Sequence, residues 1–281
     1  MADQSSSSGM VEDHSVSVPS RRRHGWGWLA EISDALVSVV FPSGCRICER
    51  VLTTASRVPL CKECLSSFER VPRIVCEVCG RPLPGLARKE GEPLLCPACQ
   101  EKTYTFDRAR SFAVYADTVV RAILLLKFER IEPLGAWFSE RLAEIVNADG
   151  DRLSADVVVP VPLHREREKE RGYNQAALIS KPLAKRLKLP HKAVLLVRTR
   201  ARPDKQVLSL EERWESVRGA FATRPGSQVD NLRVLLIDDV LTTGATLDAC
   251  ARALREAGAK SVIGLTVARA VRNPLPDSSA W

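Results

Sequence analysis

The sequence predicts an α/β protein: a parallel sheet flanked by helices, preceded by a small cysteine-rich region. Three observations predict this fold class. From about residue 104 onward, apolar segments of strand length alternate with segments of helical periodicity, which is typical of a parallel sheet with helices on its faces. Before residue 104, four CxxC pairs lie within 55 residues. Apolar residues make up 45% of the 281-residue chain, enough to build a core.

The first 28 residues predict a disordered basic tail. Residues 1–20 are rich in serine and contain little to bury. The sequence RRRHGWGW (21–28) follows, and its arginines and tryptophans could hold a nucleic-acid strand by charge and stacking. Because single charge runs are common, a basic tail whose tryptophans pack on the domain is the favoured interpretation.

Residues 29–103 are expected to hold an amphipathic helix and the cysteine-rich region. Apolar residues recur at helical spacing over 29–40, and Pro42 ends this helix. The pairs CRIC, CKEC, CEVC and CPAC are then separated by 12, 11 and 16 residues. A two-residue gap lets one tight turn direct two thiolates at one cation, and two such turns complete a tetrahedral shell of sulfur ligands.

Two structural zinc sites are therefore predicted. The first and third pairs have similar following residues, and the second and fourth each lie near a helix start, so one unit is repeated. The predicted sites are Cys45, Cys48, Cys61 and Cys64, and Cys76, Cys79, Cys96 and Cys99. An interleaved pairing stays open, because sequence alone does not fix connectivity. Disulfides, which a reducing compartment disfavours, and an iron–sulfur cluster are the alternative uses of these cysteines.

The following region, 104–270, is predicted to form the α/β domain. Strands are expected at 111–116, 156–162, 193–197, 233–238 and 261–268, and helices at 118–129, 134–146, 174–188, 209–217 and 246–257. Ser209 and Glu212 form a capping box that starts one helix, and Pro182 is expected to kink another. Cys250 lies on an apolar helix face and is expected to be a small buried residue.

The stretch VLLIDDVLTTGAT (234–246) is the strongest candidate binding site. Ligands of open α/β sheets bind at the carboxyl ends of the strands, where Asp238 and Asp239 are expected to lie. The loop behind them leads into a helix N-terminus, whose N–H groups can bind phosphate. Gly244 lets the backbone approach closely, and Thr242, Thr243 and Thr246 add hydroxyl donors. Because carboxylates accept hydrogen bonds from sugar hydroxyls, the stretch predicts a site for a ribose 5-phosphate.

This stretch also resembles the phosphoribosyl pyrophosphate (PRPP) loop of type I phosphoribosyltransferases. The segments VVVPVPLHREREKERGYNQAALIS (157–180) and KQVLSLEERWESVRGAF (205–221), together with the CxxC block, resemble the ComF family of bacterial competence-related proteins. The resemblance covers nearly everything from about residue 30 to 270. It implies a type I phosphoribosyltransferase-like parallel sheet flanked by helices, preceded by a small Cys-rich double zinc ribbon, with 271–281 as a C-terminal tail.

The resemblance implies specific roles for residues of the predicted site. Asp238 and Asp239 would hold the ribose hydroxyls of PRPP, which binds together with Mg²⁺. Arg171, beside Gly172, would lie on the pyrophosphate side, so that Asp238, Asp239 and Arg171 are the implied catalytic residues. Arg198 and the segment 199–210 would form a mobile closing loop. The residues implied to wrap the 5-phosphate are Thr242, Thr243, Gly244, Ala245 and Thr246.

Net charge and hydropathy limit the classes of function that the chain can have. A formal charge of +8 and a pI of about 9.1 permit an anionic partner. No run of 18 apolar residues occurs and no secretory signal is evident, so no membrane span and a cytoplasmic location are expected. The resemblance implies a PRPP-binding, phosphoribosyltransferase-type protein linked to DNA uptake in natural transformation, with an unspecified acceptor. The alternatives are a non-catalytic PRPP or nucleotide sensor and an accessory protein that binds single-stranded DNA, with DNA-uptake or helicase proteins as implied partners.

Overall fold

The computed structural model describes residues 44–52, 56–87, 91–101, 104–201 and 209–271. The predicted basic tail, the predicted helix over 29–40, most of the expected closing loop and the C-terminal tail lie outside the described residues. Within the described ranges, no helix combines the length and the apolar composition that crossing a bilayer requires.

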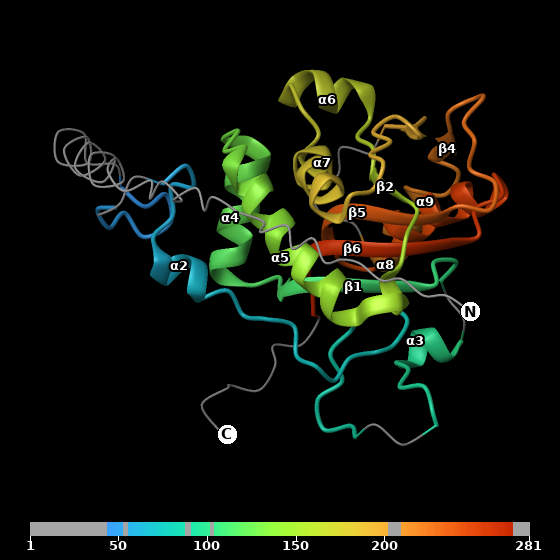
Figure 1. Ribbon diagram of the computed structural model, residues 1–281, viewed down its shortest axis with the longest axis horizontal. Helices are drawn as coiled ribbons and strands as arrows, with labels where there is room; N and C mark the ends of the chain where they lie inside the picture. The colour runs from blue at the N-terminus through green and yellow to red at the C-terminus, as the bar shows by residue number, and fades with distance from the viewer. Residues whose placement is uncertain (1–43, 53–55, 88–90, 102–103, 202–208, 272–281) are drawn as a thin grey trace, which may run out of the picture. The chain divides into compact units, whose positions relative to one another are not determined.

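Four parallel strands form the central sheet (Figure 1). They are β1 (Arg108–Val114), β2 (Val157–Pro160), β5 (Arg233–Leu241) and β6 (Ser261–Arg269), in the order β1-β6-β5-β2. All three neighbouring pairs are parallel. The near-continuous apolar sequences of β2 and of the first half of β5 follow from burial on both faces, and the predicted fold class is confirmed.

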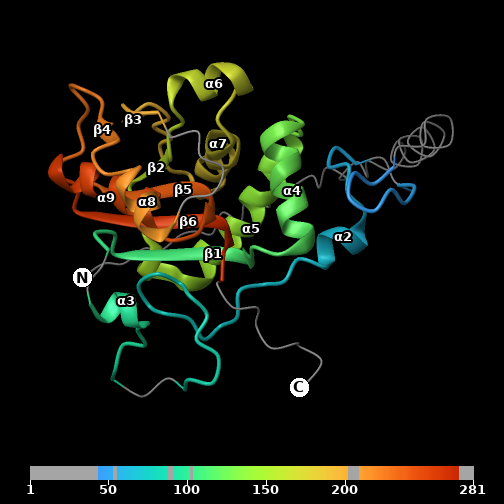
Figure 2. The same cartoon turned by 180° about the vertical axis from the view of Figure 1, so that it is seen from behind.

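Helices cover both faces of this sheet. On one face, α7 (Gln175–Leu187) packs against β2 and β5, and α5 (Pro133–Asp149) packs against β1 and β6. The α4 helix (Asp117–Phe128) packs beside α5 in the same apolar cluster. On the other face, α9 (Ala245–Glu256) packs against β5 and β6. Figure 2 shows α8 (Leu210–Glu215) and α9 on the side of the sheet opposite to α5. The α7 helix continues through Pro182.

The strand that carries the two aspartates is longer than predicted. The expected strand ends at Asp238, but β5 continues to Leu241, because β6 runs alongside it and pairs Leu241 with Arg269. On its other side, β2 ends opposite Ile237. The two aspartates therefore lie inside β5 but beyond the end of the neighbouring strand β2.

A second, smaller sheet differs from the prediction of a single parallel sheet. The expected strand over 193–197 corresponds to β3 (Leu196–Arg198), which pairs antiparallel with β4 (Phe221–Thr223). Strand periodicity identifies an extended segment but not its pairing partner, so this ribbon was not predictable. Between the two strands, the predicted capping box is confirmed: Ser209 Oγ accepts from the Glu212 N–H at 3.1 Å, and Glu212 Oε2 accepts from the Ser209 N–H at 2.8 Å.

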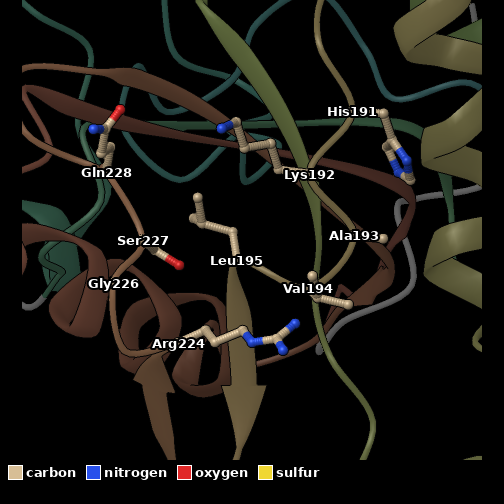
Figure 3. A pocket seen from close by; sticks show the side chains of 9 residues that line it. All are labelled: His191, Lys192, Ala193, Val194, Leu195, Arg224, Gly226, Ser227 and Gln228. Carbon is tan, nitrogen blue, oxygen red and sulfur yellow. The ribbon is translucent and has the colours of Figure 1, made fainter.

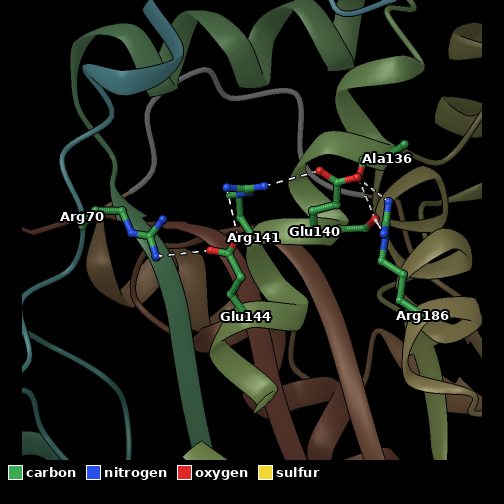
Figure 4. Close-up of polar contacts among 7 residues, drawn as sticks. Arg70, Ala136, Glu140, Arg141, Glu144 and Arg186 are labelled. Atoms are coloured by element: carbon green, nitrogen blue, oxygen red, sulfur yellow. Dashed lines mark hydrogen bonds and ion pairs between the residues drawn. The ribbon is translucent and has the colours of Figure 1, made fainter. Parts of the chain in front are cut away.

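Close packing and ion pairs connect α5 to its neighbours (Figure 4). Arg70, which follows the first cysteine site, lies 3.7 Å from Glu144, and Arg141 lies 2.9 Å from the same carboxylate. Arg186 of α7 lies 2.5 Å from Glu140. Such partly exposed pairs contribute about 0–1 kcal/mol each. They align the elements, whereas the buried apolar side chains between α5 and α7 stabilise the packing of the two helices.

Candidate functional site

The eight paired cysteines form two groups of four. Within each group the sulfur atoms lie within 4.8 Å of one another. The Sγ atoms of Cys45 and Cys64 are 3.8 Å apart, and those of Cys48 and Cys61 are 3.6 Å apart. In the second group, the Sγ atoms of Cys79 and Cys96 are also 3.6 Å apart. Tetrahedral zinc with bonds of about 2.3 Å places its sulfur ligands about 3.8 Å apart. The geometry therefore fits one tetrahedral ion in each group.

The groups follow the order of the chain rather than an interleaved pairing. Zinc site 1 consists of Cys45, Cys48, Cys61 and Cys64, and zinc site 2 of Cys76, Cys79, Cys96 and Cys99.

The two zinc sites also repeat each other in backbone geometry. The Cys45 N–H donates to Arg50 O and the Cys76 N–H donates to Arg81 O, both at 2.8 Å. The third cysteine of each site precedes a short helix: α2 (Lys62–Ser66) at site 1 and α3 (Pro97–Gln100) at site 2. This repetition agrees with the sequence pattern of one unit occurring twice.

The carboxyl ends of β2 and β5 are the place where an open α/β sheet has its ligand crevice, and we call this place the crevice. The chain leaves β2 toward α7 on one face and leaves β5 toward α9 on the other. The α6 helix (Arg165–Arg171) follows β2, and the loop before α9 follows β5. Neighbouring strands whose following helices lie on opposite faces create the place where open α/β sheets bind ligands. Asp238 and Asp239 border this crevice, because β2 ends one residue before them.

Asp239 is buried and paired with a lysine that the sequence analysis missed. Asp239 is 5% exposed. Its Oδ2 lies 3.0 Å from the Nζ of Lys127, a residue in the last turn of α4. Lys127 follows three leucines in an apolar helix, which was the only sequence signal available. A cation at the end of an otherwise buried helix face marks a place where that face reaches a polar site.

Asp238 lies on the opposite face of β5, as alternation along a strand requires. Its Oδ1 accepts from the Asp239 N–H at 2.8 Å. Burial and, next, the Asp239 carboxylate raise the pKa of Asp238 to about 7, while Lys127 and Arg198 act in the opposite direction. The two carboxylates thus occupy one end of the crevice but point to different faces, which the sequence analysis did not foresee.

The raised pKa of Asp238 predicts a pH-dependent stability. Between pH of about 4 and 7 the native state binds this proton more tightly than the unfolded state, so the free energy of unfolding falls as the pH rises through this window. We expect the stability difference between wild type and Asp238→Asn to shift in favour of the variant from pH 4 to pH 7, as measured by urea unfolding.

Asp156 provides the matched control for this pH dependence. Arg233 lowers its pKa to about 2, so its contribution is complete above pH of about 4 and disappears only in stronger acid. The difference between wild type and Asp156→Asn should therefore stay level from pH 5 to pH 7. A level difference for Asp238→Asn as well would contradict the assignment of its pKa.

The loop from Thr242 to Gly244 leads directly into α9. Gly244 is the N-cap of α9 with φ +90°, a backbone conformation that favours glycine. The Thr243 hydroxyl accepts from the Ala245 N–H at 3.3 Å. The first N–H groups of a helix have no intrahelical acceptor and carry its positive dipole. Together with the threonine hydroxyls, they can donate to an anion.

Tyr104 forms one wall of this loop and was also missed. Its hydroxyl donates to Thr243 O at 2.9 Å, and its ring lies so close to Gly244 that a Cβ there would be 2.6 Å from Tyr104 Cε1. Burial raises the pKa of Tyr104 to about 12, so the hydroxyl remains a donor. No local pattern indicates this role, because the ring reaches the loop from the segment before β1.

Arg171 lies at the C-terminal end of α6, next to α4. Its guanidinium stands 5.2 Å from the ring centre of Phe128 and donates to Gln175 Oε1. Phe128 is 69% exposed and directly follows Lys127. Arg171 is half-buried and stands beside the helix whose lysine reaches the aspartates. Gly172, with φ +78°, ends α6.

The residues after Gly172 fix the position of α7. Tyr173 donates through its hydroxyl to Leu126 O at 2.6 Å, which ties the segment to α4. Asn174 is the N-cap of α7: its Oδ1 accepts from the Ala176 N–H at 2.9 Å, and its Nδ2 donates to Val161 O at 3.0 Å. The RGYNQ motif thus anchors α4, α7 and the segment after β2 to one another.

A pocket of about 500 Å³ lies away from this crevice (Figure 3). It is bordered by His191 to Leu195, which precede β3, and by residues after β4 such as Arg224 and Ser227. His191 lies next to Val158 near the start of β2. Because ligands of open α/β sheets bind at the carboxyl ends of strands, this pocket is not the predicted sugar-phosphate site.

Comparison with known proteins identifies the two parts of the chain. Residues 169–281 match the phosphoribosyl transferase domain, and residues 36–100 match the double zinc ribbon domain. The DNA utilization protein YhgH of Escherichia coli K12 is 30% identical over 225 residues, which cover 79% of this chain and 94% of that protein. The competence protein ComFC of Bacillus subtilis is 30% identical over 218 residues, covering 75% of this chain and 84% of that protein.

A third relative agrees with these two. Competence protein F of Haemophilus influenzae is 27% identical over 219 residues, covering 75% of this chain and 90% of that protein. The matches span both the cysteine region and the α/β domain. A parallel sheet with a phosphoribosyltransferase-type loop, two four-cysteine groups and relatives of nearly full length all lead to one assignment: the chain belongs to the ComF family of competence-related proteins.

Proposed function

We propose that the protein binds PRPP together with Mg²⁺ in the crevice between β2 and β5, as a phosphoribosyltransferase-type protein that serves DNA uptake in natural transformation. The observation that carries this proposal is the placement of Asp238, Asp239 and the N-terminus of α9 at the same end of β5. The family membership and the phosphoribosyl transferase domain match support it.

The site offers complementary groups for the parts of PRPP. The N–H groups at the start of α9 and the hydroxyls of Thr242, Thr243 and Thr246 donate to the 5-phosphate. The carboxylates of Asp238 and Asp239 accept from the ribose hydroxyls. Bound Mg²⁺ would offset charge on the pyrophosphate, and Arg171 is the candidate donor on that side.

Transfer, where it occurs, needs little acid–base chemistry from the chain. A nucleophile forms a bond to the anomeric carbon of PRPP while the bond to pyrophosphate breaks, and pyrophosphate leaves. The transition state resembles an oxocarbenium ion, so negatively charged groups near the ribose stabilise it. We place Asp238 and Asp239 in this role. The acceptor stays unassigned.

Calorimetry with PRPP and Mg²⁺ tests the binding proposal. Wild type should bind, and Asp238→Asn/Asp239→Asn should lose about 10²–10⁴-fold in affinity, since each change removes a charge-assisted hydrogen bond of about 1.5–3 kcal/mol. Glu140→Gln/Glu144→Gln on α5 changes the net charge equally and should bind as wild type does. Wild type that does not bind PRPP, or a site variant that binds as tightly, would refute the proposal.

A second measurement separates transferase from sensor. If the protein is a transferase, adding a nucleobase or another acceptor to the PRPP complex releases pyrophosphate. If it is a non-catalytic sensor, PRPP binds with the same dependence on Asp238 and Asp239 but no acceptor accelerates pyrophosphate release. Both outcomes presuppose PRPP binding, so they are distinct from its failure.

A further inference from the structure

One arginine is buried beside zinc site 2 with most of its donors unused. Arg269, the last residue of β6, is 1% exposed, and its Nη2 lies 3.7 Å from Cys79 Sγ. Among the residues that the structure describes, none accepts a hydrogen bond from its Nε or Nη1. A buried guanidinium is costly unless a negative group balances it.

Zinc site 2 supplies that negative group when it is loaded. Four thiolates around one Zn²⁺ form a dianion. The nearest sulfur belongs to Cys79, and all four cysteines of the site are buried. Zinc site 1 has no such partner in its surroundings among the described contacts, and its Cys48 is exposed.

We propose that Arg269 is the counter-ion of zinc site 2. Through Arg269 and Tyr104, the order of the loop at 242–246 depends on metal binding at this site. Arg269 and Tyr104 are then positioning residues for the phosphate loop. The consequence for PRPP rests on the proposed function, whereas the consequence for the order of the loop does not.

The first connection runs through β6. Arg269 pairs in register with Leu241, the residue directly before the loop, and the Ala270 N–H donates to Leu241 O at 2.9 Å. The side chain of Arg269 therefore contacts the zinc ligand Cys79 while its backbone lies alongside the start of the loop. A shift of this arginine after loss of the dianion acts directly on Leu241.

The second connection runs through the segment between zinc site 2 and β1. Tyr104 stacks on Phe106 with ring centres 4.7 Å apart, and its hydroxyl holds Thr243 O. The neighbouring Thr105 N–H donates to Asp248 Oδ1 at 2.5 Å. Asp248 lies in the first turn of α9 and is 2% exposed. The segment thus fixes both the loop and the helix start behind it.

Zinc site 2 itself is joined to this segment and to the same core. Its cysteines pack in one apolar cluster with Phe106, Leu241 and Ala245. The Ala109 N–H donates to Val78 O at 2.6 Å within the CEVC turn. The cysteines of zinc site 1 that are buried pack instead with residues of α4 and α5. The two metal sites should therefore differ in their effect on the loop.

Hydrogen exchange of the ligand-free full-length protein tests this difference. Cys79→Ser/Cys96→Ser and Cys48→Ser/Cys61→Ser each remove one of the two zinc sites, which metal analysis verifies. We expect faster exchange of the peptide covering 240–248 after loss of site 2 and unchanged exchange there after loss of site 1. Equal exchange in both variants, whether fast or unchanged, would overturn the proposal.

Three variants that keep all eight cysteines distinguish the proposed connections from general unfolding at zinc site 2. Tyr104→Phe removes only the hydroxyl and should speed exchange at 240–248, while exchange in α5 stays unchanged. Arg269→Met should weaken zinc retention about tenfold in competition with a chelator, the size typical of lost outer-shell partners, and Arg269→Lys should restore part of it. Unchanged zinc retention in Arg269→Met, or unchanged exchange in Tyr104→Phe, refutes the corresponding connection.

PRPP binding by the two zinc-site variants is the last measurement. Loss of site 2 should weaken PRPP binding at least tenfold and loss of site 1 should not. If wild type itself does not bind PRPP, the proposed function fails, and the exchange and zinc measurements still decide whether site 2 orders the loop. If wild type binds PRPP and both zinc variants bind equally well, the proposed function stands and the coupling fails.

Discussion

Replacing Lys127 with methionine is expected to destabilise the protein by about 3–5 kcal/mol, because it leaves the carboxylate of Asp239 without its partner. Asp239 is 5% exposed and lies 3.0 Å from the lysine nitrogen. For a domain of this size the change should lower the unfolding temperature by about 6–20 °C. Thermal and urea unfolding at neutral pH measure the effect.

Two further variants show whether the unpaired charge is the cause. Lys127→Met/Asp239→Asn removes both charges and should recover most of the lost stability, since breaking a buried pair costs more than replacing both partners. Lys185→Met, at an exposed position of α7, should change stability by less than about 0.5 kcal/mol. A cost below about 1 kcal/mol for Lys127→Met, or no recovery in the double variant, would contradict the role of this ion pair.

Replacing Gly244 with alanine is expected to have the largest effect on the loop at 242–246. The φ of +90° strains any residue with a Cβ, and that Cβ would lie 2.6 Å from the Tyr104 ring. Backbone strain of about 1–2 kcal/mol and overpacking of about 1–3 kcal/mol should together destabilise the protein by about 2–5 kcal/mol. Displacing the loop should weaken PRPP binding about 10–10²-fold, since losing one charge-assisted hydrogen bond to the phosphate costs about 1.5–3 kcal/mol.

Gly226→Ala is the control that separates the effect of backbone strain from the effect of the steric clash with Tyr104. It has φ +79°, and no atom lies within 4 Å of the position a Cβ would take. Gly226→Ala should therefore show only the backbone strain, about 1–2 kcal/mol, with PRPP binding unchanged. Calorimetry and urea unfolding compare the two variants. Equal losses of stability and unchanged PRPP binding in both would show that the contact with Tyr104 does not shape the loop.

The sequence by itself determined the features that depend on neighbouring residues. The CxxC spacing defined each pair of ligands, because a two-residue turn already directs two sulfurs toward one point. Which pairs share a site was left open by the spacing and follows from the structure. The capping box at Ser209 and Glu212 and the alternation of strands and helices in the α/β domain were read in the same way. In each case the determining contacts lie within a few residues along the chain.

Only the tertiary structure decided which distant residues meet at the candidate site. Asp239 pairs with Lys127 of α4, Thr243 O accepts from Tyr104, and β3 pairs with β4 rather than joining the parallel sheet. The strand pattern likewise gave no sign that Asp238 and Asp239 extend beyond β2. The physical reason is that periodicity records which face of an element is buried, whereas the partner on that face is selected by the packing of the whole chain.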